Sequence, residues 1–206
     1  MLLENADNNT SIDQGARTRA KAEALFLRSF YYFHLIQGWG NVPLRLESTK
    51  QVTGLSMPST DKQVIYDRIT EDIKSIVTSL PKSNELAHTG TGTQSAAQAI
   101  LARIYLFRAG EHYRDNKAAG SEVKEYFSQA KYWAQQVKES NIHDLVTPYS
   151  QVFMDLSQDK YNSTGVRESI WEAEMAGNRT NSPNYSAGRV GNTFGFVSTV
   201  DSSSST

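Results

Sequence analysis

The chain has 206 residues, of which 38% are hydrophobic and 21% are charged, and its formal net charge is −1. This length and apolar content suffice for one globular domain with a buried core. Because basic residues are not in excess, the composition argues against nucleic acid or anionic lipid as a partner. Cysteine is absent from the sequence, which excludes disulfide bonds and thiolate metal sites. No apolar run reaches the roughly 20 residues of a membrane span, and the first residues do not resemble a signal peptide.

The first predicted helix is the most apolar one. Ser11 or Asp13 can cap it after a polar, Asn-rich opening. Apolar residues recur at three- and four-residue steps over 16–35, and three aromatic residues widen this stripe: Phe26, Phe30 and Phe33. A helix that is apolar on most sides belongs in the centre of a fold, so we expect His34 in the core. Gly38-Trp39-Gly40 ends the helix.

A second helix is predicted after a polar connector over 47–59. Thr60 can cap this helix, and Gln63 stands at the capping-box position three residues later. Five apolar residues then follow at spacings of three and four: Ile65, Ile69, Ile73, Ile76 and Leu80. Pro81 ends the helix.

Two longer helices and a short one are predicted next. The glycine-containing loop 82–93 is expected to be mobile. The third helix runs from Gln94 to about Ala109, with Gly110 as its stop. Ser121 can cap a fourth helix, and Pro148 can begin a short fifth one. The buried side of the fourth is predicted to carry Tyr126, Phe127, Ala130, Trp133, Ala134 and Val137.

The last part of the chain has a different pattern. Residues 169–175 alternate as in a half-buried strand, whereas 178–195 is rich in Asn, Ser and Gly. The helical part carries the cue of a tetratricopeptide repeat twice, as Leu27 with Tyr31 and Leu101 with Tyr105. The predicted fold is therefore mainly α, an irregular tetratricopeptide-like array of helical hairpins with a short strand and a loop region near the C-terminus. A generic helical bundle is the alternative.

The sequence has no recognisable catalytic motif or metal-ligand spacing. Gly90-Thr91-Gly92 follows no predicted strand, which argues against a phosphate-binding loop. Glu172 and Glu174 would project from one strand face, about 7 Å apart, at a separation that glycoside hydrolysis can use. Two solvated glutamates are the simpler interpretation. Arg28 and Arg103 lie in apolar helices, where paired charges act as structural clamps.

Five segments in order resemble the SusD/RagB family. They are Ala22–Arg28 with Tyr31–Phe33, Trp39–Leu44, Val64–Asp67 with Ile69 and Asp72 ahead of Leu80-Pro81, Ala96–Gly110, and Glu168–Glu172. We therefore divide the chain into a helical scaffold over 1–160 and the start of a loop-rich ligand-binding half over 161–206.

The resemblance implies a non-enzymatic, lipid-anchored protein at the cell surface of the outer membrane. Such a protein needs no cofactor or metal, binds an oligosaccharide or possibly a peptide, and hands it to a SusC-type TonB-dependent transporter. The lipoprotein signal with its acylated cysteine, the segment before Ala22 and the long C-terminal half of the family are expected to be missing here. A tetratricopeptide-like adaptor that binds a peptide or protein segment is the alternative function.

Sugar recognition needs flat aromatic faces together with amide and guanidinium groups, and loops make such groups available. The segment after the predicted strand has this mixture, and the family resemblance places part of a glycan site in this loop. The candidate ligand-binding residues there are Arg179, Asn181, Asn184 and Tyr185. Tyr185 is the best candidate for a stacking platform, and a polar loop with one packed tyrosine is the alternative.

The three tryptophans receive different interpretations. Trp39 is the other candidate for ligand binding, because it stands at a helix-to-loop exit between glycines, with packing beneath the connector as its alternative. Trp133 and Trp171 lie on predicted buried faces, so we expect both in the core.

Overall fold

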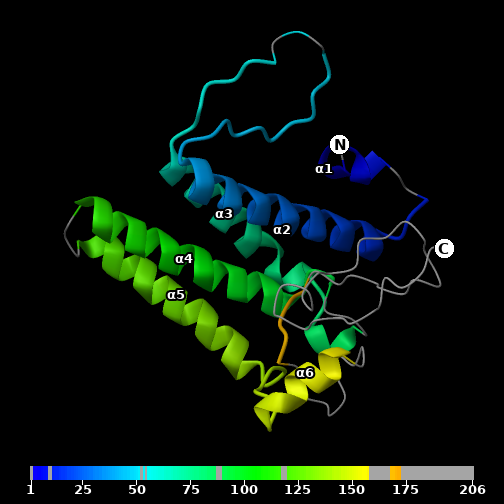
Figure 1. Cartoon of the computed structure of the whole chain (residues 1–206). Coiled ribbons are helices and arrows are strands. Elements are labelled where there is room, and N and C mark those ends of the chain that lie inside the picture. Colours follow the sequence, from blue (N-terminus) through cyan, green and yellow to red (C-terminus); the bar gives the residue numbers. More distant parts are fainter. Residues whose placement is uncertain are drawn as a thin grey trace, which may run out of the picture. The chain divides into compact units, whose positions relative to one another are not determined.

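The computed structural model in Figure 1 describes residues 2–8, 11–51, 53, 55–86, 90–116, 120–157 and 168–172. All of them belong to one compact unit that spans Met1–Glu172, and a second unit spans Ala173–Thr206. The helices of the first unit are α1 (Leu2–Asn5), α2 (Gln14–Trp39), α3 (Lys62–Ile76), α4 (Gln94–Asn116), α5 (Ser121–Glu139) and α6 (Tyr149–Ser157). Short 3-10 turns cover Ala6–Asn8, Val77–Ser79 and Ser83–Glu85.

The mainly helical fold class is confirmed. In Figure 1, α4 and α5 form an antiparallel hairpin, and α2 packs against α3. The β-pairing found in the described part of the chain is a single antiparallel bridge between Val42 and Thr60. The predicted division after residue 160 stays a prediction, because only 168–172 are described between 157 and 173.

Helix α2 begins where the sequence predicts, but only one of its faces is central. Asp13 caps it, because the backbone N–H of Ala16 donates to Asp13 Oδ2 at 3.1 Å. Its buried residues are Ala22, Phe26, Ser29, Phe33 and Ile36. Much of the predicted stripe instead faces solvent: Leu27, Tyr31 and Leu35 are 38%, 61% and 39% exposed.

The prediction that His34 lies in the core is wrong. His34 is exposed, and its ring packs edge-on against Phe30 at 4.4 Å between centroids. A helix that is apolar on nearly every side does not reveal from spacing alone which side will be covered. Here α3 and α4 cover the face centred on Phe26 and Phe33.

The cap of α3 is Asp61 and not Thr60. The Asp61 side chain accepts from Gln63 N at 2.7 Å, and Asn41 Oδ1 accepts from Lys62 N at 2.9 Å. Thr60 is occupied by the bridge, in which its N–H donates to the carbonyl oxygen of Val42 at 2.9 Å. The α-helix ends at Ile76 and tightens into a 3-10 turn before Pro81, so the predicted end at Leu80 is too late.

Helix α4 begins at Gln94 as predicted but runs seven residues past Ala109, through Gly110 to Asn116. Contacts from α3 hold the extra turns: the Tyr66 hydroxyl donates to Glu111 Oε2 at 2.9 Å, and Lys62 Nζ lies 3.5 Å from the same carboxylate. Tertiary contacts therefore override the local tendency of glycine to end a helix.

Three residues of the loop 82–93 are buried, namely Ser83, Gly92 and Thr93, while the mobility of the loop stays a prediction. Thr93 caps α4, since its Oγ1 accepts from Ala96 N at 3.1 Å and from Ser83 Oγ at 3.0 Å. Gly92 lies against the ring of Phe26, where an added Cβ would sit 3.1 Å from Cδ1. The missing side chain of glycine permits this close approach of the ring.

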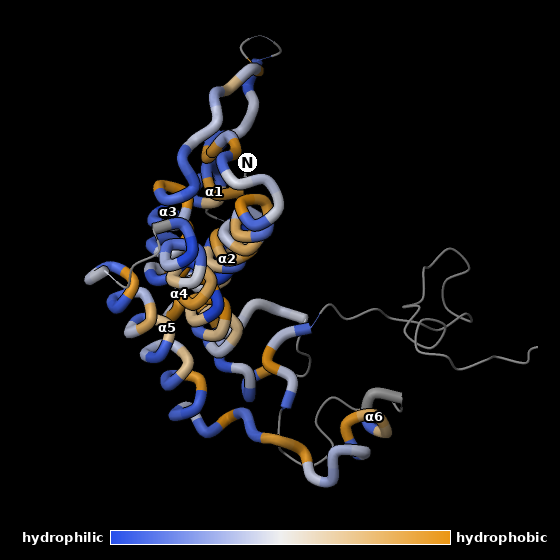
Figure 2. Tube along the Cα trace, turned by 60° about the vertical axis from the view of Figure 1, so that its left-hand side comes forward, coloured by the Kyte–Doolittle hydropathy of each residue, from blue (hydrophilic) through white to orange (hydrophobic). Residues whose placement is uncertain are grey.

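Helix α5 starts at Ser121 with Gly120 at the cap position, so the predicted cap at Ser121 is one residue too late. Hydrophilic and hydrophobic residues alternate along the helix (Figure 2). Val123, Ala130 and Val137 are its buried residues, with Tyr126 and Trp133 packed partly against the core. Phe127 and Ala134 are exposed, so the predicted buried side was too wide. The short helix α6 follows Pro148 as expected.

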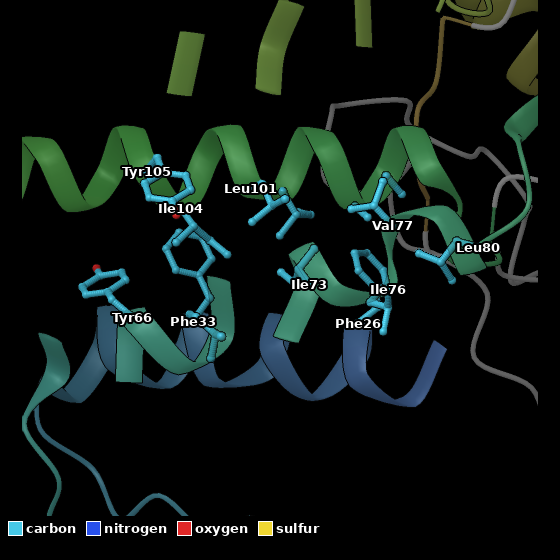
Figure 3. Close-up of a cluster of buried hydrophobic side chains, with 14 of the residues drawn as sticks. Phe26, Phe33, Tyr66, Ile73, Ile76, Val77, Leu80, Leu101, Ile104 and Tyr105 are labelled. Carbon is cyan, nitrogen blue, oxygen red and sulfur yellow. The ribbon is translucent and has the colours of Figure 1, made fainter. Parts of the chain in front are cut away.

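The core lies between α2, α3 and α4 (Figure 3). Phe26 and Phe33 from α2 point toward the isoleucines of α3 and toward Leu101 and Ile104 of α4. Burial of a phenylalanine side chain contributes about 1.5–3 kcal/mol. The most completely buried large residues are Tyr66, Phe26, Phe33, Ile36, Ile65, Ile69, Ile73, Leu101 and Ile104.

Two arginines clamp the layers. Arg28 of α2 pairs with Asp72 of α3, and Arg68 lies 3.0 Å from the same carboxylate. Arg108 of α4 pairs with Asp67 at 2.8 Å and lies over the rings of Tyr66 and Tyr126. The predicted clamp at Arg28 is thus observed, whereas Arg103 is exposed and its role as a tether stays a prediction.

The predicted strand is not formed in Glu168–Glu172, the part of it that is described. This segment has no neighbouring strand to pair with among the described residues. It is held by side chains instead: Glu168 Oε2 accepts from Val146 N at 2.8 Å, and Trp171 Nε1 donates to the carbonyl oxygen of Gly90 at 3.2 Å. Trp171 packs edge-on against Phe26 and Phe30, which confirms it as a partly buried neighbour of the core.

Candidate glycan-binding site

Trp39 is presented openly at the C-terminal end of α2. It is the last residue of the helix and is 74% exposed, so the alternative in which it packs beneath the connector is wrong. The Gly40 N–H donates to the carbonyl oxygen of Ile36 at 2.9 Å with a φ of 70°, a conformation that glycine adopts readily. A Cβ added at Gly38 or Gly40 would meet nothing within 4 Å. The backbone on either side of the indole therefore lies in open space.

The connector that follows Trp39 projects away from the helices as a long loop (Figure 1). Tyr32 fixes its first turn: the hydroxyl accepts from Arg45 N at 2.7 Å and donates to the carbonyl oxygen of Arg45 at 3.0 Å. The Arg45 guanidinium then reaches the carbonyl oxygen of Leu55 at 3.2 Å on the returning part of the loop. A loop of this length is more often functional than incidental.

Charged side chains at the start of α3 and at the end of α4 form a network of ion pairs. Lys62 lies 3.3 Å from Asp115, and Arg114 lies 3.1 Å from it. Hydrogen bonds from Arg114 and then Lys62 hold the pKa of Asp115 below its usual value. Burial, and next the hydrogen bond to Glu111, raise the pKa of Tyr66 well above its usual value. These groups tie α3 to α4.

The four other candidate residues, Arg179, Asn181, Asn184 and Tyr185, lie outside the described residues. Glu172 is the last described residue before them, and Trp171 is docked beside Phe26 and Phe30. Phe30 and Trp39 are nine residues apart on α2, or about 13 Å along the helix axis.

Asn41 and Arg45 are residues that sequence reasoning missed. They organise the connector beside Trp39 through side-chain contacts that join residues 21 and 10 positions apart. Pairings over such distances leave no local pattern in a sequence. The only available signal was the position of Asn41 two residues after Trp39.

The described residues contain no group of three or more His, Asp or Glu side chains that could hold a metal ion. None of the described helices is both long enough and apolar enough to cross a membrane.

Comparison with known proteins decides the family. The family model SusD-like_3, described as "Starch-binding associating with outer membrane", matches residues 1–106, which is just over half of the chain. The chain belongs to the SusD-like family. A SusD-like protein of Bacteroides ovatus is 29% identical over 160 residues, which cover 78% of this chain and 27% of that protein.

Solved structures agree with this assignment. A crystal structure with a xylogluco-oligosaccharide is 27% identical, with a TM-score of 0.64, over 82% of this chain and 31% of the other. A laminarin-binding SusD-like protein shares the fold at 22% identity and a TM-score of 0.61, over 78% of this chain and 32% of the other. The chain thus spans less than a third of the length of these relatives.

Proposed function

We propose that this chain is the helical scaffold, with the start of the ligand-binding part, of a cell-surface protein that captures an oligosaccharide. One observation carries the proposal. The SusD-like fold of this chain matches, at 27% identity over 82% of its length, a structure determined with a xylogluco-oligosaccharide. The open indole of Trp39 adds a flat apolar face of the kind that packs against sugar C–H groups.

The protein acts by binding alone in this proposal and breaks no bond. It delivers the oligosaccharide to a SusC-type TonB-dependent transporter by covering it as a lid, and it is held at the outer membrane by a lipid anchor on a residue outside this sequence. The outer-membrane association in the description of the family supports this location. The proposal assigns ligand contacts to Trp39 and also to Arg179, Asn181, Asn184 and Tyr185.

Calorimetry on the natural full-length protein tests the proposal. Xylogluco-oligosaccharides, laminari-oligosaccharides and a panel of unrelated peptides are titrated under identical conditions. We expect saturable binding of at least one oligosaccharide, and a weaker response in the Tyr185→Ala and Trp39→Ala variants. Binding of peptides with no response to any sugar would contradict the proposal. Co-purification with the product of the neighbouring transporter gene tests the transporter partnership separately.

A peptide-binding adaptor is the second candidate function. The observation in its favour is an open depression of about 490 Å³ on α3 and α4, with both acidic and basic groups and an aromatic wall. Its lining residues are Asp67, Thr70, Glu71, Lys74, Ser75 and Tyr105. Grooves on helical-hairpin arrays can hold extended protein segments. Loss of peptide binding on Lys74→Glu, with glycan binding absent throughout, would favour this function.

A further inference from the structure

A second, smaller cavity lies at the opposite end of the helical layer from Trp39. It has a volume of about 170 Å³ and is walled by three segments: the turn after α3, the first turns of α4, and the residues just after α5. We call it the α4-start pocket, and its lining residues are Lys82, Asn84, Gln94, Ser95, Gln98, Ser140 and Ile142. Gly92, just before α4, lies against Phe26, and Phe26 precedes Trp39 by 13 residues on α2, or about 20 Å.

The pocket is lined by groups that suit sugar hydroxyls. Asn84, Gln94 and Gln98 carry planar amides, each of which can both donate and accept hydrogen bonds, as every sugar hydroxyl can. Lys82 adds three N–H donors at the rim, and Ile142 adds an apolar surface for C–H groups. Such a mixture is what an uncharged, hydroxyl-rich ligand requires.

Several of these side chains are already fixed. Gln94 Nε2 donates to the carbonyl oxygen of Leu80 at 2.9 Å, which orients this amide. Ser140 Oγ donates to the carbonyl oxygen of Val137 at 2.6 Å and accepts from Ile142 N at 3.3 Å. Ser95 lines the pocket although it is only 1% exposed. Walls held in this way lose little conformational freedom when a ligand binds.

The size of the pocket selects one sugar ring. Its volume is about 170 Å³. That space accommodates a single pyranose and is smaller than the roughly 300–1,000 Å³ of a site for a larger ligand.

The pocket is also connected to the segment 168–172. Gly90 of the loop after α3 accepts from Trp171 Nε1, and Val146, four residues after Ile142, donates to Glu168. The segment 168–172 is therefore tied to two of the chain stretches that contribute to the pocket, and the candidates at 179–185 follow it in sequence.

We propose that the α4-start pocket binds one sugar ring of a glycan, as a subsite separate from Trp39. This inference rests on the proposed glycan-binding function and adds a second point of attachment to it. Two separate attachment points would let the protein hold a glycan chain or two branches of it.

NMR titration of the 206-residue chain with methyl β-D-glucopyranoside and methyl α-D-xylopyranoside tests the pocket. The side-chain amides of Asn84, Gln94 and Gln98 report directly on binding. We expect their signals to shift at millimolar sugar. In Gln98→Leu the affinity should fall about fivefold, the effect of one lost hydrogen bond.

Gln129→Leu is the matched control for Gln98→Leu. Both glutamines are half-buried helical residues, but Gln129 belongs to α5 and does not line the pocket. Its side chain instead donates to Glu125 Oε1 at 2.8 Å. The same chemical change at this position should leave the sugar affinity unchanged.

Unshifted pocket amides, or an equal loss of affinity in both variants, would overturn the subsite. These outcomes differ from failure of the proposed function. If oligosaccharides bind the full-length protein with dependence on Trp39 while the pocket amides do not move, only the subsite is wrong. If no oligosaccharide binds at all while the pocket amides respond to the monosaccharides, the glycan-capture function is wrong.

Discussion

The two faces of α2 have similar compositions and opposite surroundings. The inner face, with Phe26 and Phe33, is fully buried against α3 and α4. The outer face, with Leu27, Tyr31 and Leu35, is between 38% and 61% exposed and leads to Trp39 at 74%. Hydrophobic character alone therefore does not separate residues that hold the fold from residues that are available for contact. Burial and neighbours make that distinction.

Truncating one residue on each face of α2 tests this difference between the two faces most directly. Phe33→Ala should lower the free energy of unfolding by about 3–5 kcal/mol, because it removes a buried ring and leaves a cavity. Leu35→Ala, two residues later, should cost about 1 kcal/mol or less, because its side chain already contacts water. Urea denaturation of both variants measures the difference. Equal losses would show that the outer face is as important to the fold as the inner one.

The clamp between α2 and α3 gives the next largest effect. Asp72→Ala removes the carboxylate that Arg28 and Arg68 share, and leaves the mostly buried Arg28 without its partner. We expect a loss of about 2–3 kcal/mol, somewhat below that of a fully buried pair, because part of the Arg28 side chain remains in water. Glu71→Ala is the control, since Glu71 is exposed. If both variants unfold at the same temperature, the Arg28–Asp72 pair does not stabilise the fold.

Trp39 should behave in the opposite way, with a small effect on stability and a larger one on binding. Trp39→Ala should change the free energy of unfolding by about 0.5 kcal/mol or less, as for an exposed residue. Oligosaccharide affinity should fall about tenfold, which corresponds to roughly 1.4 kcal/mol of lost stacking. Calorimetry with Tyr31→Ala, a second exposed aromatic of α2, as the control distinguishes Trp39 from exposed rings in general. A substantial loss of stability would instead place Trp39 among the residues that hold the fold.

The smallest effect concerns pH and the contact between α1 and the connector. Hydrogen bonds from the Ser48 side chain and then from its backbone hold the pKa of Glu4 below its ordinary value of 4.5. A carboxylate with a lowered pKa in the folded state stabilises the contact above its unfolded pKa, and this contribution disappears as the pH falls through the folded pKa. We expect the protection of the Ser48 amide against hydrogen exchange to decline below a pH of about 4.5. Glu4→Gln should weaken the protection and remove most of its pH dependence; unchanged protection would contradict the assignment.

Sequence reasoning succeeded where only one side of a helix is apolar. In α3 the isoleucine ladder predicted the buried face directly, and Ile65, Ile69 and Ile73 are all buried. In α2 the residues are apolar on nearly every side, so periodicity could not select the Phe26 face. The choice depends on where α3 and α4 pack, which is a tertiary property.

The same limit explains the errors at helix ends and loops. Gly110 predicted a stop, but contacts of Tyr66 and Lys62 with Glu111 continue the helix. The glycines of the loop 82–93 also did not reveal that Gly92 packs against Phe26, whose ring lies close to the position of an added Cβ. The partners are far away in sequence in both cases. For the site, the sequence named Trp39 correctly as a helix-to-loop residue, but its open exposure depends on the path of the connector.

Mapping the ligand on the protein tests the central claim most directly. In an NMR titration of the chain with a xylogluco-oligosaccharide, we expect the Trp39 indole and residues 178–186 to show the largest signal changes, with little change at Phe33 or Ile73. Changes concentrated on the depression lined by Lys74 and Tyr105, or a complete absence of change with every oligosaccharide, would contradict a glycan-binding role for these exposed residues.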